Sequence, residues 1–197
     1  MSIRDEYSLM LIQLLEKTMN LLYKWVIIIL LSSALIACSE SGTDNPQTDE
    51  EIAQDLWQQL VDENYNSDWD RWPGTSGMYP PDTTLLGNDP HIGPQLFQTF
   101  MNSTAAAGIN SKTFPLANKS IVVKENYVTS VSSTTLAAIT VMLKKQGYDA
   151  DNNDWFWVKY NPDGSIVANG KVAGCIGCHG QANSFHTDTD YLWTRIP

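Results

Sequence analysis

Hydrophobic and polar positions follow a helical period near residue 50 and a strand period in the second half of the chain. Between residues 48 and 63, apolar side chains recur along one helix face, at Ile52, Leu56 and Leu60. Thr48 and Glu51 have the spacing of a capping box, in which each side chain binds the backbone N–H of the other residue. We therefore predict a helix over residues 48–63 whose apolar stripe packs into a core.

Residues 64–94 are rich in turn formers and predict a long connection without regular structure. Three large aromatic residues, Trp69, Trp72 and Tyr79, indicate that the connection packs on its own side chains. The pattern of residues 94–101 fits a strand and a helix equally well.

From residue 119 onward, the pattern predicts strands. Residues 121–128 are rich in β-branched residues and place alternate side chains on two faces: Val122, Lys124 and Asn126 on one, Ile121, Val123 and Glu125 on the other. Residues 136–143 form a nearly continuous apolar run, as expected of a strand buried on both faces. Residues 155–160 alternate again, and residues 161–165 carry Pro and Gly where a turn needs them. The predicted fold class is α+β, mainly an antiparallel β-sheet with flanking helices.

The N-terminal region has the features of an export signal. Residues 25–37 are an apolar run of 13, whereas a membrane span needs about 20 apolar residues. We expect Met19 to be the true start, with residues 1–37 as the signal peptide region. The segment that ends in Cys38 resembles a bacterial lipobox, so Cys38 is a candidate for lipidation. The alternative is a buried cysteine in an uncleaved anchor.

This interpretation predicts the domain organisation and the location. Residues 38–49 are polar and serve as a lipidated tether, and residues 50–197 form one domain. Ser39 after the lipobox cysteine favours anchoring at the outer membrane of a Gram-negative bacterium, with the domain in the periplasm.

The net charge limits the partners. The chain carries a formal charge of −10, and loss of residues 1–37 removes as many acidic as basic residues. An acidic surface argues against nucleic acid and anionic lipid, which both favour clustered Lys and Arg. It is compatible with a basic electron-transfer partner in the periplasm, although the charge is also explained by solubility alone.

The chemistry is concentrated in Cys175-Ile176-Gly177-Cys178-His179. This spacing is typical of covalent haem c attachment, in which two thiols bond to the porphyrin and the adjacent histidine binds the iron. A zinc site is the first alternative, but it normally needs four protein ligands, and no second Cys pair is present. A thioredoxin-like dithiol is the second, but too few residues follow the motif to complete a βαβ unit. We therefore expect one haem c bound by Cys175, Cys178 and His179.

Several segments in a fixed order resemble the cytochrome P-460 family and the related β-sheet cytochromes c′-beta. They are Val123–Tyr127, Val141–Lys144, Asp154–Val158, Pro162–Gly164, Cys175–His179 and Asp190–Thr194. The resemblance implies a mainly antiparallel domain, often a dimer, with a high-spin haem c and one open iron position. In the P-460 branch a lysine is also bonded to the porphyrin, and Lys124 occupies the matching position. The alternative for Lys124 is a surface lysine on a strand edge.

The resemblance also implies a function, with two departures. P-460 members oxidise hydroxylamine and bind nitric oxide, and the c′-beta relatives bind diatomic gases without turnover. The family's distal carboxylate has no counterpart in residues 138–142, and its arginine has none in residues 95–99. The first hypothesis is an open-site haem c protein that binds or oxidises small nitrogen species. The second is a non-catalytic gas-binding or electron-transfer cytochrome, in which Met142, Met101 or His91 closes the sixth iron position.

Overall fold

The computed structural model describes residues 46–80, 95–130, 133–182 and 190–192. The chain divides into two compact units, Met1–Pro46 and Gln47–Pro197, and every described helix and strand belongs to the second unit. No helix among the described residues is long and apolar enough to cross a membrane. Cys38 and His91 lie outside the described residues, so the predictions for them remain predictions.

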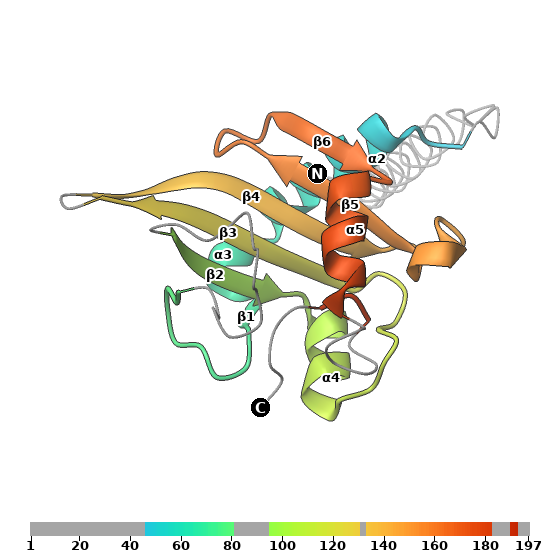
Figure 1. The fold of residues 1–197 in the computed structure, drawn as a ribbon, viewed down its shortest axis with the longest axis horizontal. Helices are drawn as coiled ribbons and strands as arrows, with labels where there is room; N and C mark the ends of the chain where they lie inside the picture. Colours follow the sequence, from blue (N-terminus) through green and yellow to red (C-terminus); the bar gives the residue numbers. More distant parts are fainter. Residues whose placement is uncertain (1–45, 81–94, 131–132, 183–189, 193–197) are drawn as a thin grey trace, which may run out of the picture. The chain divides into compact units, whose positions relative to one another are not determined.

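The described strands form one six-stranded antiparallel sheet in which each strand pairs with the next along the chain (Figure 1). The strands are β1 (Asp70–Arg71), β2 (Gln95–Met101), β3 (Ile121–Thr129), β4 (Thr134–Lys144), β5 (Trp155–Tyr160) and β6 (Ile166–Gly170). The predicted antiparallel meander, and with it the α+β fold class, is confirmed.

The helices lie before, within and after this meander. They are α2 (Asp49–Asp62), α3 (Tyr65–Asp68), α4 (Ser103–Ser111), the 3-10 turn η1 (Ala150–Asn152) and α5 (Ala173–Gly180). The predicted capping box at the start of α2 is present, because the Thr48 side chain binds the Glu51 N–H and the Glu51 carboxylate accepts from the Thr48 N–H at 2.8 Å. Capping satisfies N–H groups that the first helical turn leaves without partners.

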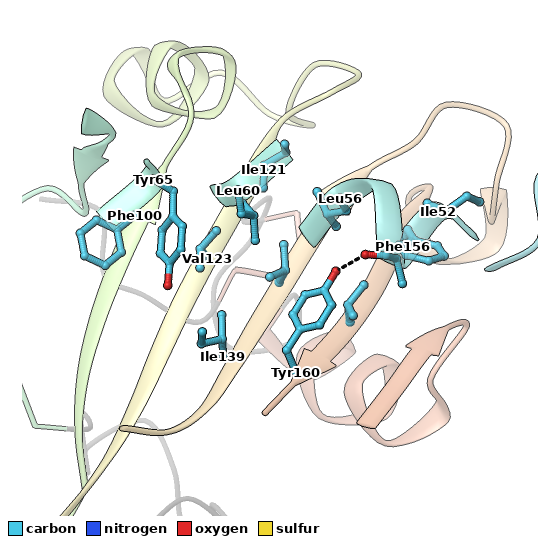
Figure 2. Close-up of a cluster of buried hydrophobic side chains, with 13 residues drawn as sticks. Ile52, Leu56, Leu60, Tyr65, Phe100, Ile121, Val123, Ile139, Phe156 and Tyr160 are labelled. Atoms are coloured by element: carbon cyan, nitrogen blue, oxygen red, sulfur yellow. Dashed lines mark hydrogen bonds between the residues drawn. The ribbon is translucent and has the colours of Figure 1, made fainter. Parts of the chain in front are cut away.

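One face of the sheet packs against α2 and α3. Its buried cluster joins the apolar stripe of α2 to alternate residues of the strands: Ile52, Ala53, Leu56, Leu60, Tyr65, Phe100, Ile121, Val123, Ile139, Val141, Phe156, Val158 and Tyr160. Figure 2 shows this cluster, with the Tyr160 hydroxyl hydrogen-bonded to the backbone carbonyl of Ala53 in α2 at 2.7 Å. The stripe is therefore core packing, as the sequence predicted.

The opposite face of the sheet packs against α4 and α5. Its buried cluster is Trp72, Met101, Ala105, Ala106, Ile109, Leu116, Val122, Met142, Trp155, Trp157 and Leu192, with Cys175, Ile176 and Tyr191 packed against it. Val122 belongs to this cluster, whereas Ile121 and Val123 belong to the other, so the predicted alternation in β3 is confirmed.

Some strand predictions were incomplete or wrong. Residues 95–101, which fitted both elements, form a strand because they pair with β3 along their whole length. The prediction that residues 136–143 are buried on both faces is right only in part: Ile139, Val141 and Met142 are buried, whereas the residues before Ile139 are half-buried or exposed. Conversely, β5 is buried on both faces over Trp155–Val158, because helices cover it on both sides. Part of the 64–94 connection is regular, as α3 and β1 show, and Trp72 in it is buried.

Candidate functional site

The motif Cys175–His179 lies within α5, which crosses the sheet on the face opposite α2 (Figure 1). Residues three apart on a helix lie one above the other, so Cys175 and Cys178 share a helix face, with His179 beside them. Both cysteine side chains are half-buried. The helix therefore presents two thiols and one imidazole to the same region of the molecule.

Two lysines of the sheet lie close to the first of these thiols. Burial raises the pKa of the Cys175 thiol, and its neighbour Cys178 adds to the rise. The charges of Lys159 and Lys124 act in the opposite direction on that pKa, which places both ammonium groups within electrostatic range of Cys175. The structure thus places Cys175, Cys178 and His179 on one helix and Lys124 on the sheet face that this helix covers.

The imidazole of His179 is held in one orientation. Its Nδ1 lies 2.8 Å from the backbone carbonyl oxygen of Tyr191, and its ring lies 4.8 Å from the ring of Trp157 in β5. A carbonyl oxygen can only accept, so Nδ1 carries the proton and Nε2 keeps its lone pair. Histidine ligands of metals commonly have this second hydrogen bond, because it fixes the ring and makes the coordinating nitrogen more basic.

The strand register shows which residues share this face of the sheet. One row across the strands is Met101, Val122, Met142 and Trp157, the next is Thr99, Lys124, Thr140 and Lys159, and the third is Phe97, Asn126 and Ala138. Because Trp157 contacts His179, the first row lies nearest the imidazole. The other two rows continue the same surface.

Lys124 lies in the middle of the sheet. Its strand β3 pairs with β2 on one side and β4 on the other, so Lys124 does not lie at an edge of the sheet, and the cross-link stays a prediction. The side chain is half-buried, and its Nζ lies 4.6 Å from the centre of the Phe97 ring. The Lys124 ammonium is thus held on the face that carries the motif helix.

In these three rows, as far as the structure describes the chain, two buried polar atoms have no hydrogen-bond partner. They are Trp157 Nε1, a donor, and Asn126 Oδ1, an acceptor. The orientation of the Asn126 amide is set by its Nδ2, which donates to the carbonyl oxygens of Lys124 and Ala138 at 3.1 and 3.2 Å. Buried polar groups are nearly always satisfied, so the Trp157 N–H suits a porphyrin carboxylate, and the Asn126 oxygen suits a ligand that carries an N–H or O–H group.

The chain segment after α5 is held by a residue that sequence reasoning missed. Asp190 is 3% exposed and forms an ion pair with Lys144 at 2.7 Å. Its partner lies 46 residues away along the chain, and no local pattern predicts such a pair. The resemblance pointed to Asp190–Thr194 as a family segment but gave it no role.

The two methionine candidates for the sixth iron position are packed in the core. Met101 is 1% exposed and Met142 is 7% exposed, and both belong to the buried cluster that contains Trp157. Either thioether would have to leave this packing to reach a ligand position, so we assign neither as a ligand.

The fold and the site define a class of protein: an antiparallel β-sheet whose C-terminal helix carries a haem-attachment motif over one sheet face. The model of the cytochrome P460 family matches residues 67–194, which is well over half of the chain. The chain therefore belongs to the cytochrome P460 family, whose members bind haem. No curated protein matches the chain.

Proposed function

We propose that this chain carries one haem c, with Cys175 and Cys178 as its thioether anchors and His179 as its axial ligand. The observation that carries the proposal is the 2.8 Å hydrogen bond from His179 Nδ1 to the Tyr191 carbonyl. It fixes the ring through Nδ1, so Nε2 is the nitrogen that would bind the iron, on the helix that presents both thiols. Each S–H adds across one vinyl double bond, so attachment balances without an oxidant.

With Cys175, Cys178 and His179 holding the haem, its iron would supply a binding position for small nitrogen species such as nitric oxide and hydroxylamine. Among the strand residues that face α5 in β2 to β5, as far as the structure describes them, none is Asp or Glu; Glu125 faces α2 and α3 instead. The region offers Lys124 as a donor and Asn126 Oδ1 as an acceptor. Neutral or weakly basic ligands suit such surroundings, because no carboxylate repels or deprotonates them.

The chemistry of these residues favours reversible binding of a ligand over its catalytic oxidation. Hydroxylamine oxidation needs a group that takes up protons as electrons leave, and an amide oxygen such as Asn126 Oδ1 is too weak a base for that role. Asn126 accepts a hydrogen bond from an N–H or O–H of the ligand and thereby orients it. We propose that any electrons pass to a basic periplasmic protein attracted by the acidic surface.

A second candidate function is oxidoreductase activity with a haem cross-linked to Lys124. The position of Lys124 on the central strand β3, within electrostatic range of Cys175, favours this candidate. The cross-link replaces one amine N–H and one porphyrin C–H, so it releases two protons and two electrons and needs a two-electron oxidant such as a peroxide. Phe97 lies against the Lys124 Nζ and keeps part of its water away.

The test compares two lysine variants on the same row of the sheet, Lys124→Ala and Lys159→Ala, in protein matured with a haem c assembly system. Intact mass and absorbance report attachment, and a protease digest reports whether the haem peptide also contains Lys124. We expect haem in all three proteins and a nitric oxide adduct in the wild type. A cross-link predicts that only Lys124→Ala changes the digest and shifts the Soret band.

Clear results contradict each candidate. Colourless wild-type protein with both thiols unmodified refutes haem c attachment. Normal ligand binding by His179→Ala refutes its axial role. A wild-type digest in which the haem peptide lacks Lys124 refutes the cross-linked oxidoreductase.

We also propose export to the periplasm, with Cys38 lipidated at the outer membrane. The apolar run of residues 25–37 before Cys38 supports this location. Fractionation of cells that express the wild type and Cys38→Ala tests it: the wild type is expected in the membrane fraction and the variant in the soluble periplasm. Equal distribution of the two proteins contradicts lipidation.

A further inference from the structure

We propose that Asp190 is the positioning residue that sets the donor strength of His179, acting through the backbone carbonyl of Tyr191. The inference rests on the proposed function in one respect, that His179 binds the iron. It adds a control on the axial ligand from a residue that lies outside the attachment motif.

Asp190 accepts hydrogen bonds from residues in four separate parts of the chain. Its carboxylate accepts from Lys144 Nζ at 2.7 and 2.8 Å, from the Leu116 N–H at 2.7 Å and from Asn153 Nδ2 at 3.0 Å. The indole N–H of Trp155 reaches the Asp190 carbonyl at 2.9 Å and the carboxylate at 3.2 Å. With a 3% exposed side chain, Asp190 is fixed to β4, β5 and the segment after α4.

The backbone at this point has a conformation that needs such support. Asp190 and Tyr191 are consecutive non-glycine residues with left-handed φ values of 51° and 68°. Left-handed conformations are unfavourable for residues with a Cβ atom, and they persist where the surroundings enforce them. The bonds to the Asp190 side chain are the enforcing contacts, and the resulting turn directs the Tyr191 carbonyl to His179 Nδ1.

The side chain of Tyr191 is a second support for the same turn. Its hydroxyl donates to Asn152 Oδ1 at 3.2 Å, and its ring lies 6.4 Å from that of Trp157. These contacts are longer and more exposed than those of Asp190. We therefore assign the main positioning role to Asp190 and use Tyr191→Phe as a variant that keeps the backbone carbonyl in place.

The consequence concerns the electronic character of the axial ligand. A strong acceptor on Nδ1–H makes the imidazole a better donor, and this stabilises ferric over ferrous iron. When the carbonyl moves away, the ferric state loses this preference and the reduction potential rises. A tenfold change in the ratio of the two states corresponds to about 59 mV for a one-electron couple.

The test measures the reduction potential and the resonance Raman iron–histidine stretch of the haem-loaded protein. The variants are Asp190→Asn, which leaves a buried lysine without its counterion, and the double variant Lys144→Met with Asp190→Leu, which removes both charges. We expect both variants to keep the haem and to lower the iron–histidine stretching frequency. We also expect the ratio of ferrous to ferric protein at a fixed potential to rise about tenfold, which corresponds to a rise of about 59 mV in the reduction potential. Tyr191→Phe removes only the weaker support from its hydroxyl and is expected to change both values by less than the Asp190 variants do.

The matched control removes a buried carboxylate on the opposite face of the sheet. Glu125 is 4% exposed and accepts from the Tyr65 hydroxyl at 2.8 Å. Glu125→Gln is expected to lower stability with an unchanged potential and stretch. Wild-type values of both in the Asp190 variants overturn the proposal, as does a rise in potential of the same size in Glu125→Gln.

Failure of the proposed function is distinguishable from failure of this inference. If the wild type carries no haem, or His179→Ala keeps the same iron ligation, the proposed function fails. Nitrogen NMR of the His179 ring in the full chain then decides the positioning role on its own. A proton held on Nδ1 in the wild type and on Nε2 in Asp190→Asn supports positioning, and the same tautomer in both overturns it.

Discussion

In the turn between β5 and β6, Gly164 lies against Trp57 of α2, and replacing this glycine tests how the helix is fixed to the sheet. Gly164 has a φ of +86°, and a Cβ atom added there would overlap the indole of Trp57. Trp57 in turn packs against Tyr160, with ring centroids 5.0 Å apart. Gly164→Ala therefore strains the backbone and pushes Trp57 off Tyr160.

The expected cost has two parts. A left-handed residue with a Cβ atom costs about 1–2 kcal/mol. Loss of an aromatic pair costs about 0.5–1.5 kcal/mol beyond the buried area. Together they predict that Gly164→Ala lowers the free energy of unfolding by about 1.5–3.5 kcal/mol. Cys175, Cys178 and His179 lie on the other side of the sheet, so we expect the absorbance spectrum of haem-loaded protein to stay unchanged.

Gly147→Ala is the matched control. Gly147 has a φ of +80°, but a Cβ atom there would meet no heavy atom within 4 Å. Gly147→Ala should lower the free energy of unfolding only by the cost of the left-handed backbone, about 1–2 kcal/mol. Chemical denaturation followed by tryptophan fluorescence measures both variants. Equal losses in the two variants would refute the role that we give to Trp57.

Three further predictions follow from single contacts. Thr48→Ala removes the cap of α2 and should lower the free energy of unfolding by about 1 kcal/mol, measured by denaturation, whereas Thr134→Ala on an exposed strand end should change it little. Burial and the hydrogen bond to Glu125 raise the pKa of Tyr127 to about 12. Since an unfolded tyrosine ionises near pH 10, stability should fall between about pH 10 and 12, and less so in Tyr127→Phe. Cys178→Ala should retain haem through one thioether, seen as a pyridine haemochrome band at longer wavelength than in the wild type.

Local signals were enough to predict much of the fold. The alternation in β3, the Pro and Gly of the β5–β6 turn and the capping box of α2 each act over a few residues, and each prediction was right. The attachment motif is also local, because one helix turn contains both thiols and the imidazole. Signals of this kind need no knowledge of distant partners.

The parts that sequence reasoning missed depend on distant partners or on weak patterns. Helix α4 is short and rich in alanine, so it has no clear apolar stripe, and the Asn102 cap is its strongest local signal. The strand nature of β2 comes from pairing with β3. The ion pair of Lys144 with Asp190 joins the end of β4 to the segment after α5, and a charged residue at a strand end normally indicates solvent exposure.

The distribution of unsatisfied polar atoms separates the two faces of the sheet. Among the described residues, the buried side-chain atoms without a partner are Trp72 Nε1, Ser120 Oγ, Asn126 Oδ1 and Trp157 Nε1. None belongs to a residue of the cluster under α2, whereas Trp72 and Trp157 belong to the cluster under α4 and α5. A buried polar atom without a partner costs about 1–3 kcal/mol. A fold tolerates such atoms on one face when another molecule satisfies them there, and the face beneath α5 is the one on which His179 and both thiols lie.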